Sequence, residues 1–488
     1  EKSGGLSVDN SGAENHCTIF SIAESPLNKE ILWAGTDDGN IQITKDGGKT
    51  WTNVILNIQG LPKNTWCYHI EASVFNEGTA YAVFDGHSKN DYATYVYKTS
   101  DFGKTWNSIV TTDIDGFARN IQEDYKNPNL LFLGTEKGLY ITVDGGKNWS
   151  KFENNMPAVA VHYLDLHPKT NDLVMATHGR GIIIIDDVSP LRQITPDILK
   201  KDVHFFEMKP FVIEEQSSFG GTASELEFVG ANPNTAAQIV YYLKKRHTFG
   251  KMELEIQDMN GNKIVALPTG NQKGINIVTW GFNTKNPKIA TGKTVSMGGF
   301  TAPRVPEGTY KAVLTKGKET YTQEFKVIND PKSVISSVER KKQAEATKML
   351  FDKNEELAYM VYELDAMIDL NKKIIEKDPK TVKANNKIAA EFNALKNTMV
   401  VTTGDMYVGA AEPELREKLT AIYSTVASQF DAPSPSQLAN IESVMDSFNT
   451  AKSTFTNLKS KYKNKLIEQA AKLQIPFSLK SFEEYLKD

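Results

Sequence analysis

A chain of 488 residues is too long for one ordinary hydrophobic core, and this length predicts about three domains. The formal net charge is only −4, and no run of Lys or Arg exceeds three residues, which argues against a dedicated nucleic-acid surface. Two cysteines, Cys17 and Cys67, exclude a disulfide scaffold and a CxxC zinc site and leave their own pairing open. The longest purely aliphatic run, Ile182–Ile185, is far shorter than the roughly 20 residues of a membrane span. The chain begins at Glu1 without a signal-peptide pattern, so we expect further residues upstream.

An eight-residue pattern occurs three times in the first third of the chain. Thr-x-Asp-x-Gly-x-x-Trp is found at 44–51, 99–106 and 142–149. Its Asp and Gly suit a hairpin turn that needs side-chain capping and a positive φ, and its Trp is expected to pack between neighbouring sheets. We therefore interpret the acidic and aromatic members of the pattern as structural, namely Asp46, Trp51, Asp101, Trp106, Asp144 and Trp149.

Alternating apolar residues and turn signals place each copy between the third and fourth strands of a four-strand unit. The predicted strands of the first three units lie at 18–22, 32–36, 41–44 and 51–56, then at 68–72, 80–84, 94–98 and 106–110, then at 119–123, 131–135, 139–142 and 149–152. A fourth unit at 162–166, 173–177 and 182–185 has Asp186-Asp187 in place of the pattern and no Trp after it. We interpret this fourth unit as degenerate.

In the rest of the chain, the spacing of apolar residues changes once, from the pattern of strands to the pattern of helices. Strands predicted at 239–243, 252–257, 275–280, 308–314 and 320–327 indicate an Ig-like or fibronectin-type sandwich. After Asn329-Asp330-Pro331, stripes of Leu and Met without any Gly from 332 to 403 predict about four helices in an antiparallel bundle. The alternative is that an exposed stripe binds a partner. The expected domains are therefore 1–200, 201–331 and 332–488.

The repeated pattern resembles the Asp-box of BNR and sialidase-type β-propellers. Residues 13–200, with Gly-Thr-Asp-Asp-Gly at 35–39, Gly-Thr-Glu-Lys-Gly at 134–138 and Ala-Thr-His-Gly-Arg-Gly at 176–181, resemble the C-terminal blades of bacterial sortilin-like propeller proteins, often labelled "glycosyl hydrolase, BNR repeat". The order propeller, sandwich and helical tail is similar too. The resemblance implies a multidomain, mainly β protein with an incomplete ring of blades in this chain. It also implies a secreted, periplasmic or outer-membrane-associated location.

Successive hairpins of a blade alternate between the two ends of the ring, so the turns between second and third strands lie opposite the boxes. Propellers usually bind ligands at that end, and the candidates there are Asp37, Asp38, Glu136, His178 and Arg180. The alternative is that the glycines beside them close tight turns and the charges are merely solvated. Arg119 and Glu123 share a face of an innermost strand and join the candidates, although a structural ion pair between them is the commoner arrangement.

These features favour a non-catalytic protein that binds a polypeptide, a partner protein or a glycan, with an upstream propeller segment or a partner chain completing the ring. The alternative is a glycoside hydrolase of the BNR or sialidase-like class. Residues 1–200 hold only Arg119, Arg180 and Arg192, whereas sialidases need three arginines around the substrate carboxylate, and Arg192 lies beyond the last blade. No catalytic residue is assigned, and we predict no cofactor, no metal and no nucleic-acid partner because the ligand and phosphate motifs are missing.

Overall fold

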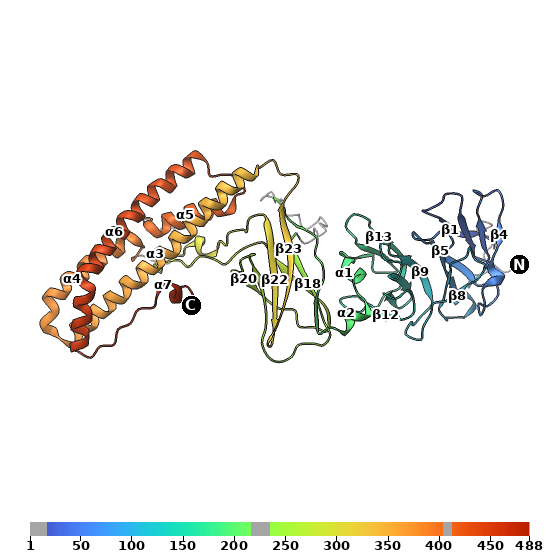
Figure 1. Ribbon diagram of the computed structural model, residues 1–488, viewed down its shortest axis with the longest axis horizontal. Helices are drawn as coiled ribbons and strands as arrows, with labels where there is room; N and C mark the ends of the chain where they lie inside the picture. The colour runs from blue at the N-terminus through green and yellow to red at the C-terminus, as the bar shows by residue number, and fades with distance from the viewer. Residues whose placement is uncertain (1–16, 216–234, 404–411, 488) are drawn as a thin grey trace. The chain divides into compact units, whose positions relative to one another are not determined.

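The computed structural model describes residues 17–215, 235–403 and 412–487, and the chain divides into two compact units, Glu1–Phe206 and Glu207–Asp488 (Figure 1). In its described part, the first unit consists of small β-sheets and short helices. The second contains two facing sheets followed by long helices. The protein is multidomain and, apart from its helical C-terminal region, mainly β, as the sequence predicted.

Four antiparallel sheets follow one another in the first unit, and strands that are consecutive in sequence are neighbours in each sheet. The first sheet comprises β1 (Ile19–Glu24), β2 (Leu32–Thr36), β3 (Ile41–Thr44) and β4 (Thr52–Asn53), and the second β5 (Trp66–Ala72), β6 (Ala80–Asp85), β7 (Tyr95–Thr99) and β8 (Asn107–Ser108). The third comprises β9 (Ala118–Glu123), β10 (Leu131–Thr135), β11 (Gly138–Thr142) and β12 (Ser150–Lys151), and the fourth β13 (Val161–Leu166), β14 (Leu173–Thr177) and β15 (Ile182–Ile185). Short elements connect or follow them: η1 (Ile55–Asn57), η2 (His87–Lys89), α1 (Ser189–Arg192), α2 (Pro196–Lys200) and β16 (Val203–Phe205).

Each sheet packs on the next through a buried apolar layer, so the four sheets are blades of a propeller. Trp33 and Ile41 of the first blade share one core with Phe84 of the second. A second layer joins Val83 of the second blade to Leu133 of the third, and a third layer joins the third and fourth blades. The innermost strands β1, β5, β9 and β13 lie beside one another in that order.

Hydrogen bonds within each Asp-box close the hairpin between the third and fourth strands. In the first box the Asp46 carboxylate accepts bonds from the Thr44 hydroxyl at 2.8 Å, the Thr50 amide at 2.9 Å and the Thr50 hydroxyl at 2.6 Å. Gly48 has a φ of +91°, which disfavours a side chain, and its amide donates to the Thr44 hydroxyl. The other two boxes repeat this network, with an Asn amide replacing the second Thr hydroxyl in the third box.

The three box tryptophans are not equivalent, contrary to the expectation that each packs between sheets. Trp106 is 6% exposed and lies edge-on to Trp33 of the preceding blade, with ring centroids 5.9 Å apart. Trp149 is 4% exposed and its indole N–H donates to the Ile109 carbonyl of the preceding blade at 2.8 Å. Trp51 is 44% exposed because the described residues place no sheet on its side of the first blade.

The second unit opens with a β-sandwich. One sheet pairs β18 (Ala237–Leu243) with β21 (Gly274–Trp280), and the other has the order β17 (Phe211–Ile213), β23 (Glu319–Asn329), β22 (Gly308–Lys316), β19 (Met252–Gln257) and β20 (Lys263–Leu267). Trp280 of the first sheet contacts Tyr310 and Phe325 of the second, each with ring centroids 6.0 Å apart. The two sheets therefore face each other across an aromatic core. The finer Ig-like assignment stays a prediction.

In the described part of the second unit, four helices of 14 to 41 residues follow the sandwich. They are α3 (Ser337–Lys377), α4 (Val382–Met399), α5 (Leu415–Ser428) and α6 (Pro435–Lys472), with the short elements η3 (Met297–Phe300), η4 (Pro379–Thr381) and α7 (Phe482–Tyr485) beside them (Figure 1). Capping boxes at Ser336 and Ser434 begin α3 and α6. The predicted Leu and Met stripe of α3 is buried in the helical core with Phe448 and Phe455 of α6. Among the described residues, no helix combines the length and apolar character needed to cross a membrane.

Candidate functional site

The strongest candidate site lies at the end of the blades opposite the Asp-boxes, which we call the box-distal end. The innermost strands β5, β9 and β13 begin there, and β6, β10 and β14 end there, because Trp66 pairs with Asp85 and Ala118 with Thr135. Loops at strand ends carry binding residues on a rigid scaffold more often than other parts of a fold do.

A buried ion pair is the centre of this end. Nη1 of Arg119 lies 2.5 Å from Oδ2 of Asp85, and the two residues are 8% and 1% exposed. The Asp85 carboxylate also contacts Nδ1 of His87 at 2.8 Å and accepts a bond from the His87 amide at 2.9 Å. The Arg119 guanidinium is thereby held in one orientation, and among the described residues its Nε–H has no acceptor.

Aromatic rings enclose the guanidinium. Its carbon lies 4.6 Å from the ring centre of Tyr68 and 4.8 Å from that of Phe117. The His87 ring stacks on Phe117 at 5.0 Å with an interplanar angle of 11°. Cation–π contacts of this kind are strongest where water is excluded, so the surrounding rings reinforce the position that Asp85 imposes.

The aromatic surface continues toward the first blade. Trp66 contacts Tyr68 with centroids 5.2 Å apart, and Phe20 lies 4.6 Å from Trp66 and 5.2 Å from Tyr68. Phe20 is 48% exposed, and the buried Trp66 indole N–H has no acceptor among the described residues. We call Phe20, Trp66, Tyr68, Phe117 and Arg119 the aromatic–arginine cluster.

A histidine pair lies beyond Arg119. His162 at the start of β13 stacks on the predicted candidate His178, with ring centroids 5.1 Å apart. Desolvation lowers the pKa of His162, and the positive charges of Arg119 and His178 lower it further, whereas Glu136 and Asp85 act in the opposite direction. These influences show that blades two to four contribute to one electrostatic environment.

The predicted acids of the first blade form bonds within their own turn. Asp37 accepts bonds from the amides of Cys17 and Thr18, both at 2.8 Å. Asp38 accepts one from the Thr36 hydroxyl and another from the side-chain amide of Asn40 at 2.9 Å. Both carboxylates thus order the chain around the β2–β3 hairpin, and a ligand contact by either stays a prediction.

The other predicted candidates of this end, Glu136, His178 and Arg180, have exposed side chains in the turns after β10 and β14. Residues 179 and 181 beside Arg180 are glycines with φ of +92° and +65°, and a Cβ at either would meet no atom within 4 Å. Open space around this turn leaves the Arg180 side chain accessible to a ligand.

The expected ion pair between Arg119 and Glu123 is wrong. Glu123 lies at the box end of β9, where its carboxylate accepts bonds from Ser73 at 2.7 Å, Tyr81 at 2.9 Å and the Val74 amide at 3.0 Å. Burial raises the Glu123 pKa even though these bonds favour the charged form. Glu123 therefore ties the second blade to the third and does not reach the box-distal end.

Sequence reasoning missed Trp66, Tyr68 and Phe117. Hairpin alternation does predict the turn at 85–91 at this end, but it singles out neither Asp85 nor His87. Trp66 and Asp85 lie just outside the predicted strands 68–72 and 80–84. The alternation of apolar residues also does not indicate which strand ends lie close together in the folded protein. Within the described residues there is no group of three or more His, Cys, Asp or Glu side chains placed to hold a metal ion.

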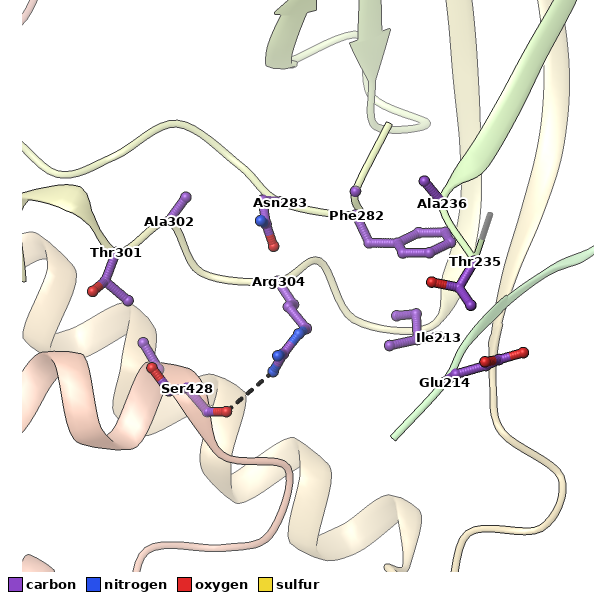
Figure 2. Close-up of a pocket in the computed structure, with 12 residues that line it drawn as sticks. Ile213, Glu214, Thr235, Ala236, Phe282, Asn283, Thr301, Ala302, Arg304 and Ser428 are labelled. Carbon is purple, nitrogen blue, oxygen red and sulfur yellow. Dashed lines mark hydrogen bonds between the residues drawn. The ribbon is translucent and has the colours of Figure 1, made fainter. Parts of the chain in front are cut away.

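The described part of the second unit contains cavities that the sequence did not indicate. A cavity of about 300 Å³ lies where the sandwich loops meet α5, and Figure 2 shows Arg304, Asn283 and Glu214 around it. Arg304 donates to the Ser428 carbonyl at 3.3 Å, the bond drawn in Figure 2. A larger cavity, of about 1300 Å³, lies between the sandwich and α3. Their mixed linings show no converging acid and base of the kind that catalysis needs.

Comparison with known proteins defines the class of the blades. Residues 94–200 match the family model Sortilin-Vps10, described as "Sortilin, neurotensin receptor 3". This match runs from the third strand of the second blade to the end of α2. The first unit is therefore a sortilin-like β-propeller segment. No curated protein matches the chain.

Solved structures match parts of the chain at low similarity. They include YCF48 from Cyanidioschyzon merolae (16% identity, TM-score 0.27, 35% of this chain and 53% of that chain) and a structure titled YCF48 bound to D1 peptide (17%, 0.24, 35% and 65%). The GH74 enzyme of Niastella koreensis is 14% identical, with a TM-score of 0.27, covering 64% of this chain and 46% of the enzyme. This chain thus spans between about half and two thirds of these proteins.

Proposed function

We propose that the box-distal end binds a polypeptide and that the protein is a non-catalytic binding protein. The observation that carries the proposal is the aromatic–arginine cluster, in which Asp85 and the rings of Tyr68 and Phe117 hold Arg119 in a single orientation. Trp, Tyr and Arg are the residues that dominate binding energy at protein interfaces, especially when their orientation is fixed before binding.

The exposed ring surface of the cluster favours a polypeptide over a glycan or a whole partner protein. Phe20 is 48% exposed, whereas the Nε–H of Arg119 and the indole N–H of Trp66 are buried donors, so a ligand would meet the rings. The rings beside these donors suit apolar side chains of a peptide. A glycan or a folded partner protein remains a possible outcome of the binding test.

Hydrolysis of glycosides is the second candidate, and the geometry gives it less support. Glycosidases use one carboxylic acid and one carboxylate about 5 to 10 Å apart. At the box-distal end, Asp85 is bonded to Arg119 and His87, while Asp37 and Asp38 are bonded within their turn. Glu136 is the remaining predicted acid, so the described residues offer no evident catalytic pair.

A matched pair of tryptophans tests the binding site. The full chain is screened against a peptide library, and Trp66→Ala is compared with Trp51→Ala, which removes an indole from the box end of the first blade. Loss of a binding hot spot of about 2 kcal/mol or more predicts an affinity at least about 30-fold lower for Trp66→Ala. Equal losses in both variants would show that the site is elsewhere. Binding of oligosaccharides alone would replace the polypeptide by a glycan, and aryl glycoside hydrolysis abolished by Trp66→Ala would favour the enzyme.

We also propose that further propeller sheets cover the open faces of the first and fourth blades. A Cβ on Gly103 would lie 2.9 Å from Val54 of the preceding blade, and one on Gly146 would lie 2.9 Å from Ile109, so these box turns rest on the blade before them. The equivalent Gly48 has only Trp51 nearby. The lack of a described sheet before the first blade also explains why Trp51 is exposed.

The fourth blade presents the complementary face. Ile182 and Ile184 are 71% and 55% exposed, and they alternate along β15 with Ile183 and Ile185, which pack on the core shared with the third blade. An upstream segment or a partner chain with propeller sheets would bury both faces. The full chain alone should therefore self-associate at micromolar concentration, and Ile182→Asp with Ile184→Asp should reduce this in sedimentation velocity. A monomer at all concentrations would contradict the proposal.

For the remaining parts we propose the division 1–200, 201–331 and 332–488, with the sandwich and the bundle as spacer and docking modules. The resemblance to sortilin-like proteins supports a secreted, periplasmic or outer-membrane-associated location. Fractionation of cells that produce the full-length protein tests the location.

A further inference from the structure

One end of the β-sandwich in the second unit brings three loops together. They are segment 244–251 between β18 and β19, segment 268–273 between β20 and β21, and the β22–β23 hairpin, and the strand registers place all three at the same edge. The His247 amide donates to the Asn271 carbonyl at 2.9 Å, and the Gly317 amide donates to the Lys251 carbonyl at 2.9 Å. The loops are therefore fixed to one another as a single surface.

This surface, which we call the basic end, is strongly positive. Besides Lys244 and Lys316, which have partners of their own, the described residues of this end include five basic side chains: Lys245, Arg246, Lys251, Lys273 and Lys318. Among the described carboxylates, Glu253 pairs with Lys251 at 2.9 Å, and Glu319 accepts a bond from the Tyr321 hydroxyl. The excess of cations contrasts with the net charge of −4 for the whole chain.

An exposed aromatic ring lies among these cations. Phe249 is 91% exposed at the apex of segment 244–251, next to Gly250 with a φ of +93°. His247 steadies the apex, because its Nε2 lies 3.1 Å from the Gly250 carbonyl. The phenyl ring is therefore presented to solvent on the same segment as Lys245, Arg246 and Lys251.

We propose that the basic end docks onto an anionic lipid bilayer, with Phe249 entering the interface and the cations contacting lipid headgroups. Aromatic rings favour the membrane–water interface, and basic clusters are attracted to anionic leaflets. The aromatic ring or the basic cluster alone would give weak attachment, whereas their binding free energies add when both contact the membrane. A soluble polyanion would neutralise the cations equally well but would leave the phenyl ring in water, so the exposed ring favours the bilayer.

Co-sedimentation of the full chain with vesicles tests the proposal. Vesicles of phosphatidylcholine alone are compared with vesicles that also contain phosphatidylserine, and we expect binding to the second kind only, weakened by added salt. Lys245→Glu with Arg246→Glu should lower partitioning at least about 25-fold, since each cation contributes about fivefold. Phe249→Ser should lower it about tenfold, because the ring no longer leaves water.

A charge-matched variant separates this surface from overall charge. Lys341→Glu with Lys342→Glu changes the net charge by the same amount on the exposed side of α3, and should leave partitioning unchanged. Equal losses in the two double variants would overturn the proposal, and so would unchanged binding by Phe249→Ser. Binding to soluble polyphosphate without binding to vesicles would also overturn it. Thermal melts confirm that each variant is folded, as changes in exposed loops usually shift stability by less than about 0.5 kcal/mol.

Discussion

Replacement of Trp149 by Ala tests whether the Asp-box is a folding device. The indole is 4% exposed, lies in the core shared by the second and third blades, and donates to the Ile109 carbonyl at 2.8 Å. Truncation of a buried Trp leaves a cavity and costs about 3 to 5 kcal/mol. For a unit of this size, each kcal/mol shifts the melting temperature by about 2 to 4 °C, so Trp149→Ala should lower it by about 6 to 20 °C.

Trp51→Ala is the matched control, because the same motif position is 44% exposed in the first blade. Its indole donates within its own box, to the Gly48 carbonyl at 3.1 Å, and about 1 kcal/mol is expected from the smaller apolar area lost. Differential scanning calorimetry of the full chain measures both variants. If Trp149→Ala melted with the wild type yet lost ligand binding, the box would belong to the binding site and the structural assignment would be refuted.

Three other changes test the remaining contacts. Hydrogen bonds from Thr50 lower the pKa of Asp46 to about 2, below its unfolded value of 3.8, so its stabilisation is complete above about pH 4 and is lost toward pH 2. The melting-temperature gap between wild type and Asp46→Asn should therefore narrow over that range, and a constant gap would contradict the assignment. Arg119→Met leaves the buried Asp85 carboxylate without its cation and should cost about 3 to 5 kcal/mol in denaturant unfolding, partly recovered by adding Asp85→Asn. Ser336→Ala removes the capping box of α3 and should cost about 1 kcal/mol by far-UV circular dichroism melts, whereas Ser336→Thr should cost less.

The strands of the first unit could be predicted because the sequence of each hairpin turn contains the residues that form it. Strands β2, β3, β10, β14 and β15 have the predicted bounds, since capping residues and glycines fix both ends of each turn. The fourth strands were predicted too long: β4, β8 and β12 are two residues each, because an outermost strand pairs on one side only and soon leaves the sheet.

Two strands of the sandwich were missed for different reasons. β17 (Phe211–Ile213) is three residues long and pairs in parallel with β23, so no hairpin turn marks it. β20 (Lys263–Leu267) is an edge strand, partly exposed on both faces, and therefore lacks a clear alternation. The helices were easier to predict than these strands, because Pro and Gly residues separate the long stripes of Leu and Met.

The centre of the candidate site could not be predicted, because it depends on how blades meet. Arg119 and Asp85 are 34 residues apart and come from different sheets, so neither periodicity nor spacing relates them. The predicted partner Glu123 fails on distance alone: four residues along a strand span about 13 Å, well beyond an ion pair. A spacing of four residues brings two charges together only on a helix, because four residues make about one helical turn.

Ring completion and ligand binding are connected through the first strand. The Ser21 hydroxyl accepts a bond from the Ile70 amide of the second blade, so the neighbouring Ile22, 69% exposed, lies on the open face of the first blade. The same strand carries Phe20, which contacts Trp66 in the aromatic–arginine cluster. A sheet packed on Ile22 would therefore restrain β1 and fix the Phe20 ring. Because a restrained site loses less conformational freedom on binding, completing the ring should tighten ligand binding even if the added sheet never touches the ligand.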